Sequence, residues 1–196
     1  SDLIHAETIV GAVVQSSNEM VAPGVVRHAG GSRHGMILGR PAGGSDGMLD
    51  AFAALLASAG YTTRISDDIR AEIWTKTLLA ASAGPVAALT GADLGRLTED
   101  AESFALLTEL MQEGVAIGRA FGLVIDEDIE ARLDFFCGKA VRPSMLQDVE
   151  AGRALEVENG IFAIVRIATT LGIDAPRTHA VAALMRIKIA MAKKPA

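Results

Sequence analysis

The feature that most constrains the fold is a change of hydrophobic pattern near residue 66. From residue 67 onward the apolar residues recur at helical spacing, and no segment has the pattern of a strand. Glycine and proline residues, which commonly end or begin helices, separate the periodic segments. Helices are predicted over 67–83, 99–121, 126–139, 145–153, 157–171 and 177–192. Residues 66–196 are therefore predicted to form an all-helical domain.

Residues 1–65 have the pattern of an α/β segment instead. Residues 8–15 are rich in β-branched side chains and almost continuously apolar, which is typical of a strand covered on both faces. A helix is expected to end at Ser58, shortly before Gly60. Further strands are predicted over 25–29, 34–39 and 62–65. The sequence thus predicts a mostly α chain, in which the end of a doubly wound, Rossmann-type α/β domain precedes the helical domain.

A dinucleotide site of the doubly wound kind needs a strand, a G-x-G-x-x-G turn and a helix whose N-terminus receives the pyrophosphate. No G-x-G-x-x-G occurs in the 196 residues, and the first residue is Ser1 rather than Met. We therefore expect the chain to be a fragment that does not contain a complete dinucleotide site of this kind. No cofactor-binding residue is assigned within it.

Composition argues against several classes of protein. The formal net charge of −6 argues against a general nucleic-acid-binding protein, and no apolar stretch reaches the ~18 residues of a membrane span. Cys137 is the only cysteine, and the four histidines lack the spacing of a metal-ligand pair, so no metal site is predicted. Because a single cysteine provides no disulfide framework, a cytoplasmic location is expected. Cys137 itself is expected to be a small buried side chain.

Lys76 is isolated in a long apolar segment, as the only charged residue between Ile73 and Ala92. On a helix it shares a stripe with Ile69 and Ile73, so its ammonium would lie among apolar side chains. One interpretation is a structural lysine that snorkels to water or pairs with a carboxylate. The other is a general acid that faces a cleft. The pattern alone leaves both interpretations open.

Ser144 begins a segment, bounded by Pro143 and Gly160, that contains several chemically suggestive side chains. It follows a proline and precedes Gln147 by three residues, which predicts a capping box with Ser144 as the N-cap. Asp148 and Arg153 are interpreted as a local ion pair or as helix-packing groups.

Two acidic residues, Glu156 and Glu158, are expected at the start of the next helix. Acidic side chains in a first turn commonly interact with the helix dipole, and this interpretation suits Glu158 well. Asn159 is a candidate for a polar contact.

Two stretches, taken together, resemble the ketopantoate reductase family, the 2-dehydropantoate 2-reductases. The first is DI followed by IWTK within residues 68–76, and the second is SMLQDVEAGRALE over residues 144–156. Their order and spacing also look like that family, and the resemblance covers essentially the whole chain as the C-terminal portion of a longer enzyme.

The resemblance implies NADPH-dependent reduction of a 2-oxo acid, ketopantoate to pantoate, in pantothenate biosynthesis. Lys76 would be the catalytic acid that protonates the carbonyl oxygen as hydride arrives at carbon. Glu156 would bind the substrate hydroxyl, and Ser144 would hydrogen-bond the substrate carboxylate. If so, all three side chains should line one solvent-open concavity. The amount of apolar surface in a helical domain of this kind further predicts a homodimer.

The chain departs from the family at two positions. The family members most like authentic ketopantoate reductases carry asparagines four and eight residues after the lysine, where this chain has Ala80 and Gly84. Two alternatives therefore stand beside ketopantoate reduction. One is a paralogous reductase of another carbonyl or imine, and the other is a non-catalytic helical module for dimerisation or ligand binding.

Overall fold

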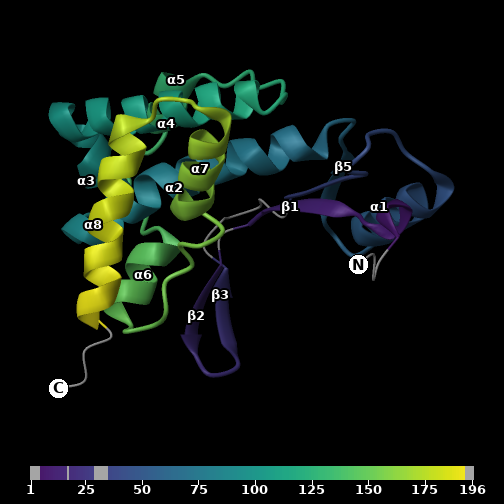
Figure 1. Ribbon diagram of the computed structural model, residues 1–196. Coiled ribbons are helices and arrows are strands. Elements are labelled where there is room, and N and C mark those ends of the chain that lie inside the picture. The colour runs from purple at the N-terminus through teal and green to yellow at the C-terminus, as the bar shows by residue number, and fades with distance from the viewer. Residues whose placement is uncertain (1–4, 17, 29–34, 193–196) are drawn as a thin grey trace. The chain divides into compact units, whose positions relative to one another are not determined.

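The computed structural model describes residues 5–16, 18–28 and 35–192 (Figure 1). The chain divides into two units, Ser1–Trp74 and Thr75–Ala196, which we call the N-terminal unit and the helical unit. The border falls within one helix, α2 (Ile69–Thr90), so the first turns of α2 belong to the N-terminal unit.

The N-terminal unit contains a three-stranded sheet in the order β1-β4-β5. Its strands are β1 (Gly11–Gln15), β4 (Gly35–Gly39) and β5 (Thr62–Ile65), and β1 follows the short 3-10 helix η1 (Ala6–Thr8). β1 pairs antiparallel with β4, whereas β4 and β5 are parallel and joined through α1 (Gly47–Ser58). A parallel pair with a helical crossover is the basic unit of doubly wound folds.

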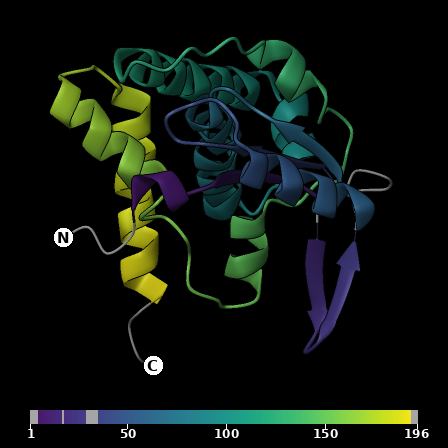
Figure 2. The same ribbon diagram turned by 90° about the vertical axis from the view of Figure 1, so that its right-hand side faces the viewer.

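A separate hairpin is formed by β2 (Asn18–Ala22) and β3 (Val25–His28) (Figure 2). The turn between them contains Gly24, whose φ of 75° is one that glycine adopts without strain. The strand predicted over 62–65 is confirmed. The strand predicted over 25–29 is confirmed from Val25 to His28, and residue 29 lies outside the described residues. The strand predicted over 34–39 is confirmed from Gly35, and His34 lies outside the described residues.

Helix α1 begins and ends at side-chain and backbone signals that the sequence contains. Asp46 is the N-cap, and its carboxylate accepts a hydrogen bond of 2.9 Å from the Leu49 amide. The buried Arg40 donates to the same carboxylate at 2.9 Å. Gly60, with a φ of 92°, follows the helix end as predicted.

Ile69, the first residue of α2, packs closely on the sheet. Gly11 and Gly39 face each other across the β1–β4 pair, and a Cβ added to either would lie 2.7 Å from an Ile69 side-chain atom. Val13, Ile37 and Ile69 form the buried cluster here. The expectation that residues 8–15 are covered on both faces is wrong for this chain, because only Val13 of that strand is buried.

The helical unit contains the rest of α2 and six further helices within its described residues. They are α3 (Leu94–Glu99), α4 (Ala101–Ala120), α5 (Ile129–Asp134), α6 (Ser144–Glu150), α7 (Ile161–Leu171) and α8 (Pro176–Ala192). α4 packs against α3, α5, α7 and α8, and α7 also packs against α8 (Figure 1). Described residues 66–192 contain no strand, so the predicted fold class is confirmed.

Helix α8 is attached to α4 through its first turn. The Glu113 carboxylate of α4 accepts hydrogen bonds from the Arg177 and Thr178 amides at 3.0 and 2.8 Å and from the Thr178 hydroxyl at 2.7 Å. Glu109, one turn earlier, pairs with the Arg177 guanidinium at 2.6 Å. These contacts satisfy amides that a helix start leaves without intrahelical partners. None of the helices in the described part of the chain is both long and apolar enough to cross a membrane.

Candidate functional site

Lys76 is exposed on α2, in the helical unit. Two residues further on, Leu78 is buried and packs so closely on α4 that a Cβ added to Gly114 would lie 2.5 Å from Leu78 Cδ2. Because two residues turn a helix by about 200°, Lys76 lies on the side of α2 that faces away from α4. The ammonium is therefore presented on a face that this packing leaves open.

Ser144 is exposed at the first position of α6, and the predicted capping box is wrong. Pro143 occupies the N-cap position, where it provides no side-chain hydrogen bond. The Gln147 side chain donates instead to the Arg142 carbonyl, at 2.9 Å. The helix starts one residue earlier than predicted because of the proline. Its ring fixes φ, and the Pro143 conformation, φ −58° and ψ 151°, suits the residue before a helix.

The structure brings the helix of Ser144 beside the helix of Lys76. A Cβ added to Gly84 of α2 would lie 3.7 Å from the Met145 Cβ of α6, an ordinary packing distance. Met145 is buried there, directly after Ser144. Lys76 and Gly84 are about 12 Å apart along the helix axis, at 1.5 Å per residue. Ser144 therefore lies near the half of α2 that follows Lys76.

Glu156 lies in the loop between α6 and α7, whereas we expected it at the start of a helix. α7 begins at Ile161, and Gly160 is its N-cap. Glu156 is exposed, between the half-buried Leu155 and the buried Val157. Its joint placement with Lys76 and Ser144 in one concavity stays a prediction.

The other polar residues of this loop have structural partners. Asp148 and Arg153 form the predicted ion pair, at 2.7 Å. Glu158 pairs with Arg166 of α7, at 3.1 Å, and its carbonyl accepts a second hydrogen bond from that guanidinium. Glu158 is thus held by an arginine, two residues before the N-cap, rather than by the helix dipole. Asn159 is exposed in the turn that follows.

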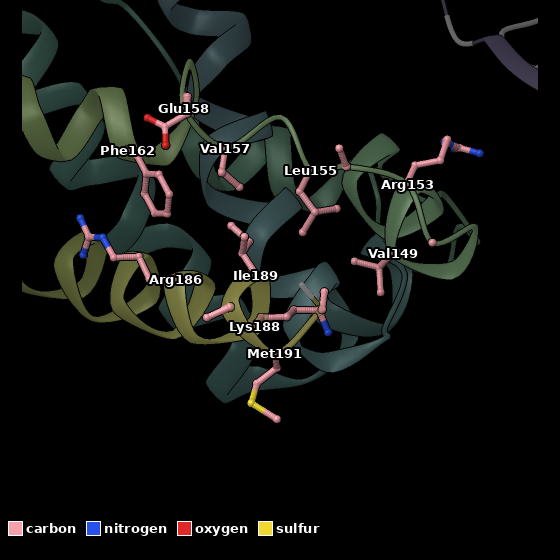
Figure 3. A pocket seen from close by; sticks show the side chains of 14 residues that line it. Val149, Arg153, Leu155, Val157, Glu158, Phe162, Arg186, Lys188, Ile189 and Met191 are labelled. Carbon is pink, nitrogen blue, oxygen red and sulfur yellow. The ribbon is translucent and has the colours of Figure 1, made fainter. Parts of the chain in front are cut away.

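A cavity of about 1000 Å³ lies in the helical unit, between the α6–α7 loop and the C-terminal half of α8 (Figure 3). Lys76, Ser144 and Glu156 are not among its lining residues. Two cations of α8, Arg186 and Lys188, do line it, and the sequence analysis did not single them out. The available signal was that they are the only charged residues within 180–192.

The exposure of Cys137 contradicts the expectation of a buried side chain. It lies in the turn after α5, where its amide donates to the Asp134 carbonyl at 3.0 Å. Among the described residues, no group of three or more His, Cys, Asp or Glu side chains could hold a metal ion.

Shifted pKa values are found at the starts of three helices, at Asp46, Asp100 and Arg177. The Leu49 amide, followed by Arg40, holds the pKa of Asp46 below its ordinary value, against some desolvation. The Ser103 amide does the same for the pKa of Asp100, the N-cap of α4. Hydrogen bonding and attraction from Glu109 raise the pKa of Arg177.

The fold and these segments define a helical C-terminal domain that follows the last strands of a Rossmann-type domain. Residues 68–188 match the family model described as "Ketopantoate reductase PanE/ApbA C terminal". The 2-dehydropantoate 2-reductase of Mesorhizobium japonicum is 33% identical over 184 residues, 93% of this chain and 56% of the relative. That of Caulobacter vibrioides is 34% identical over 190 residues, 93% of this chain and 61% of the relative. The chain belongs to the ketopantoate reductase family.

Solved structures of ketopantoate reductases have the same fold as this chain. The 2-dehydropantoate 2-reductase of Geobacter metallireducens matches with a TM-score of 0.88 at 27% identity, over 95% of this chain and 62% of that one. D-mandelate dehydrogenase, solved with NADH and anilino(oxo)acetate, matches with a TM-score of 0.86 at 18% identity, over 98% of this chain and 64% of that one, which shows the fold alone. The chain spans about 56–61% of the length of the two curated relatives.

Proposed function

We propose that the protein to which this chain belongs is an NADPH-dependent reductase of a small 2-oxo acid, with ketopantoate as the first candidate substrate. The observation that supports this most is the packing of α6 on α2, which brings the segment of Ser144 beside the helix of Lys76. In this proposal residues 1–65 are the end of the nucleotide-binding domain, and residues 66–196 bind the substrate. The protein is assigned to the cytoplasm and acts as a homodimer.

The described residues at the start of the helix that joins the parallel strands do not fit a complete NADPH site. A dinucleotide needs open amides at the turn between a strand and a helix. In this chain the helix that joins the parallel strands is α1, and the carboxylate of Asp46 already accepts from its Leu49 amide. A carboxylate at that place would repel a pyrophosphate. The cofactor is therefore assigned to residues outside the chain, which alone should be inactive.

In the proposed reaction the side chains of this chain bind the substrate and supply a proton. The Lys76 ammonium donates a hydrogen bond to the substrate carbonyl oxygen and transfers its proton as negative charge develops on that oxygen. Glu156 accepts from the substrate hydroxyl, and the Ser144 hydroxyl donates to the substrate carboxylate. Two hydrogen bonds at separate substrate groups fix its orientation toward the ammonium.

The substrate pocket should be less polar than in relatives with asparagines at the positions of Ala80 and Gly84. Neither residue has a side-chain donor or acceptor. A 2-oxo acid other than ketopantoate is the specific alternative that this supports.

The test uses the full-length enzyme and two matched pairs of variants. Lys76→Ala should lower kcat by roughly 10²-fold or more, as for loss of a general acid, whereas Lys139→Ala should leave kcat unchanged. Glu156→Gln should mainly raise KM, whereas Glu158→Gln should not. An unchanged kcat in Lys76→Ala would leave only the interpretation of Lys76 as a structural lysine that snorkels to water or pairs with a carboxylate.

A further inference from the structure

The cavity between the α6–α7 loop and α8 is built entirely from the helical unit. Figure 3 shows the side chains of Leu155 and Val157 pointing toward Ile189 of α8. Val157 and Phe162 are buried, and Met191, near the end of α8, is 63% exposed. The cavity therefore has an apolar interior and an opening to solvent. Its volume of about 1000 Å³ is at the upper end of the range that holds drug-sized ligands.

Positive charge borders this apolar interior. Arg186 lies over the Phe162 ring, with the guanidinium carbon 4.9 Å from the ring centroid. Lys188, two residues further along α8, also lines the cavity and is half-buried. Within the part of the chain that the structure describes, neither cation has a carboxylate within salt-bridge distance.

The remaining charged residues of the lining are already paired. Arg153 is bound by Asp148 at 2.7 Å, and the cavity's one acidic lining residue, Glu158, is bound by Arg166 at 3.1 Å. The charge left to interact with a ligand is therefore that of Arg186 and Lys188. An anion is the complement of such a border, and an apolar chain is the complement of the interior.

We propose that this cavity binds an amphiphilic anion, a carboxylate or phosphate attached to an unbranched apolar chain of about eight to twelve carbons. The chain lies against Leu155, Val157 and Ile189, and the head group lies beside Lys188, the half-buried one of the two cations. Arg186, two residues earlier on α8, points in another direction and adds only longer-range attraction. A cation that is half-buried at an apolar wall gains more from an anion than one in open water, because the local dielectric constant is lower.

The cavity also has a geometric relation to Glu156. Leu155 and Val157 line it, whereas Glu156 between them does not. Glu156 is the central residue of a tight turn, because the Val157 amide donates to the Leu155 carbonyl at 3.0 Å. A ligand that immobilises Leu155 and Val157 should therefore restrict the backbone of Glu156. Any effect on catalysis rests on the proposed function, but binding itself does not.

The test is a titration of the isotope-labelled chain followed by amide chemical shifts, with affinity from calorimetry. The probes are decanoate, decyl phosphate, decanol and inorganic phosphate. Decanoate and decyl phosphate should bind and shift the amides of Leu155, Glu156 and Val157. Decanol should bind several-fold more weakly, because it lacks the charge, and inorganic phosphate should not bind measurably. A preference for one of the two acids identifies the head group.

The variants separate the two halves of the proposal. Lys188→Gln should weaken decanoate binding by roughly threefold, the effect of losing a partly exposed charge pair, and Arg186→Gln should weaken it less, while decanol binding stays the same in both variants. Lys139→Gln, which removes a cation from another surface, is the control. Ile189→Ser should weaken decanoate and decanol alike.

Several results would overturn the proposal. One is equal binding of decanol and decanoate, and another is decanoate binding that neither cation variant affects. A third is a concentration-dependent shift of the same amides without ligand, because a second copy of the chain would then occupy the cavity. None of these measurements uses activity, so a negative result would be distinct from failure of the reductase proposal.

Discussion

The two units of this chain bury their apolar side chains to very different degrees. In the N-terminal unit, α1 has twelve residues and one buried side chain, Leu49, whereas Phe52 and Leu55 are 42% and 64% exposed. In the helical unit, α4 has twenty residues, of which seven are buried. Both helices are amphipathic enough to form, but α4 is surrounded by four other helices and α1 covers one edge of a small sheet.

This difference shows that an apolar face is buried only where the chain provides a second surface. A sheet of the doubly wound kind is normally covered on both faces. Here Val14 of β1 is 39% exposed, and Val26 of the separate β2–β3 hairpin is 60% exposed. We propose that the longer protein covers these residues. The N-terminal unit should then be the less stable unit of this chain, since it has fewer buried contacts to lose.

The largest expected effect comes from Gly39→Val, which should unfold the N-terminal unit selectively. A Cβ at Gly39 would lie 2.7 Å from both the Ile69 Cβ and the Ser66 carbonyl oxygen, and the backbone oxygen cannot move away cheaply. Overpacking of this kind costs about 1–3 kcal/mol or more, which is a large share of a small unit's stability. Amide hydrogen exchange, measured separately for each unit, reports the loss.

The control is Gly47→Ala at the start of α1, where an added Cβ meets nothing within 4 Å. That variant should leave exchange unchanged or slow it slightly. Equal destabilisation of both units by Gly39→Val would contradict the view that they respond separately.

The second prediction concerns the densely packed helical unit. It compares two glycines at which an added Cβ would lie equally close to its nearest neighbour. A Cβ at Gly95 would lie 2.5 Å from the Lys139 carbonyl oxygen, and one at Gly114 would lie 2.5 Å from Leu78 Cδ2. Gly95→Ala should lower the free energy of unfolding by about 1–3 kcal/mol, because its obstacle is backbone. Gly114→Ala should cost less, because the leucine can change rotamer and alanine favours the helix. Denaturant unfolding measures both, and a larger loss in Gly114→Ala would show that Leu78 cannot adjust.

Much of the secondary structure could be predicted because its signals are local. Asp46 and Gly60 bracket α1, and the stop at Gly122 places the end of α4 within a residue. The Asp148–Arg153 pair was also predictable, because the two residues are five positions apart.

The errors arose where tertiary contacts decide. α2 continues past Pro85 to Thr90, although the prediction ended at residue 83. The preceding Gly84 lacks the Cβ that would clash with the proline ring, and residues 81–88 are all buried, so packing compensates for the missing hydrogen bond. The six-residue α3 was missed because a tertiary contact also determines its sequence. Glycine usually disfavours a helix, and Gly95 is present in α3 because the Lys139 backbone approaches too closely for a side chain.

The candidate site was predictable in its residues but not in its surroundings. The motif around Lys76 and the one ending at Glu156 are visible in the sequence, because each is a contiguous stretch. The cavity lined by Arg186 and Lys188 is not, because its walls come from segments about 30 residues apart that only the fold brings together.

The third prediction concerns the attachment of α8 to α4, with two glutamates that interact with the same arginine. Glu113 is 11% exposed and accepts three hydrogen bonds, whereas Glu109 is 44% exposed. Glu113→Gln should destabilise the helical unit by about 1–3 kcal/mol, because donors at the start of α8 lose a charged acceptor. Glu109→Gln should have a much smaller effect, as for an exposed ion pair. Thermal unfolding compares them, and similar shifts in Tm would mean that burial does not distinguish the two carboxylates.

The smallest expected effect is a pH dependence at the helix caps of the two units. The pKa of Asp46 in the N-terminal unit is held below its ordinary 3.8, chiefly by the Leu49 amide, and the pKa of Asp100 in the helical unit is lowered by the Ser103 amide. A carboxyl whose pKa is lower in the folded state stabilises that state fully above its unfolded pKa. The contribution is lost as the pH falls through the folded pKa.

Asp46→Ala should therefore destabilise the N-terminal unit at pH 7, and the difference from the unsubstituted chain should shrink as the pH falls below 3.8. Asp100→Ala should do the same in the helical unit alone. Hydrogen exchange at pH 7 and circular dichroism at lower pH measure these changes. A destabilisation by Asp46→Ala that is the same at pH 7 and pH 2.5, about one unit or more below the ordinary pKa, would mean that the ionised cap contributes nothing and that only its size or shape matters.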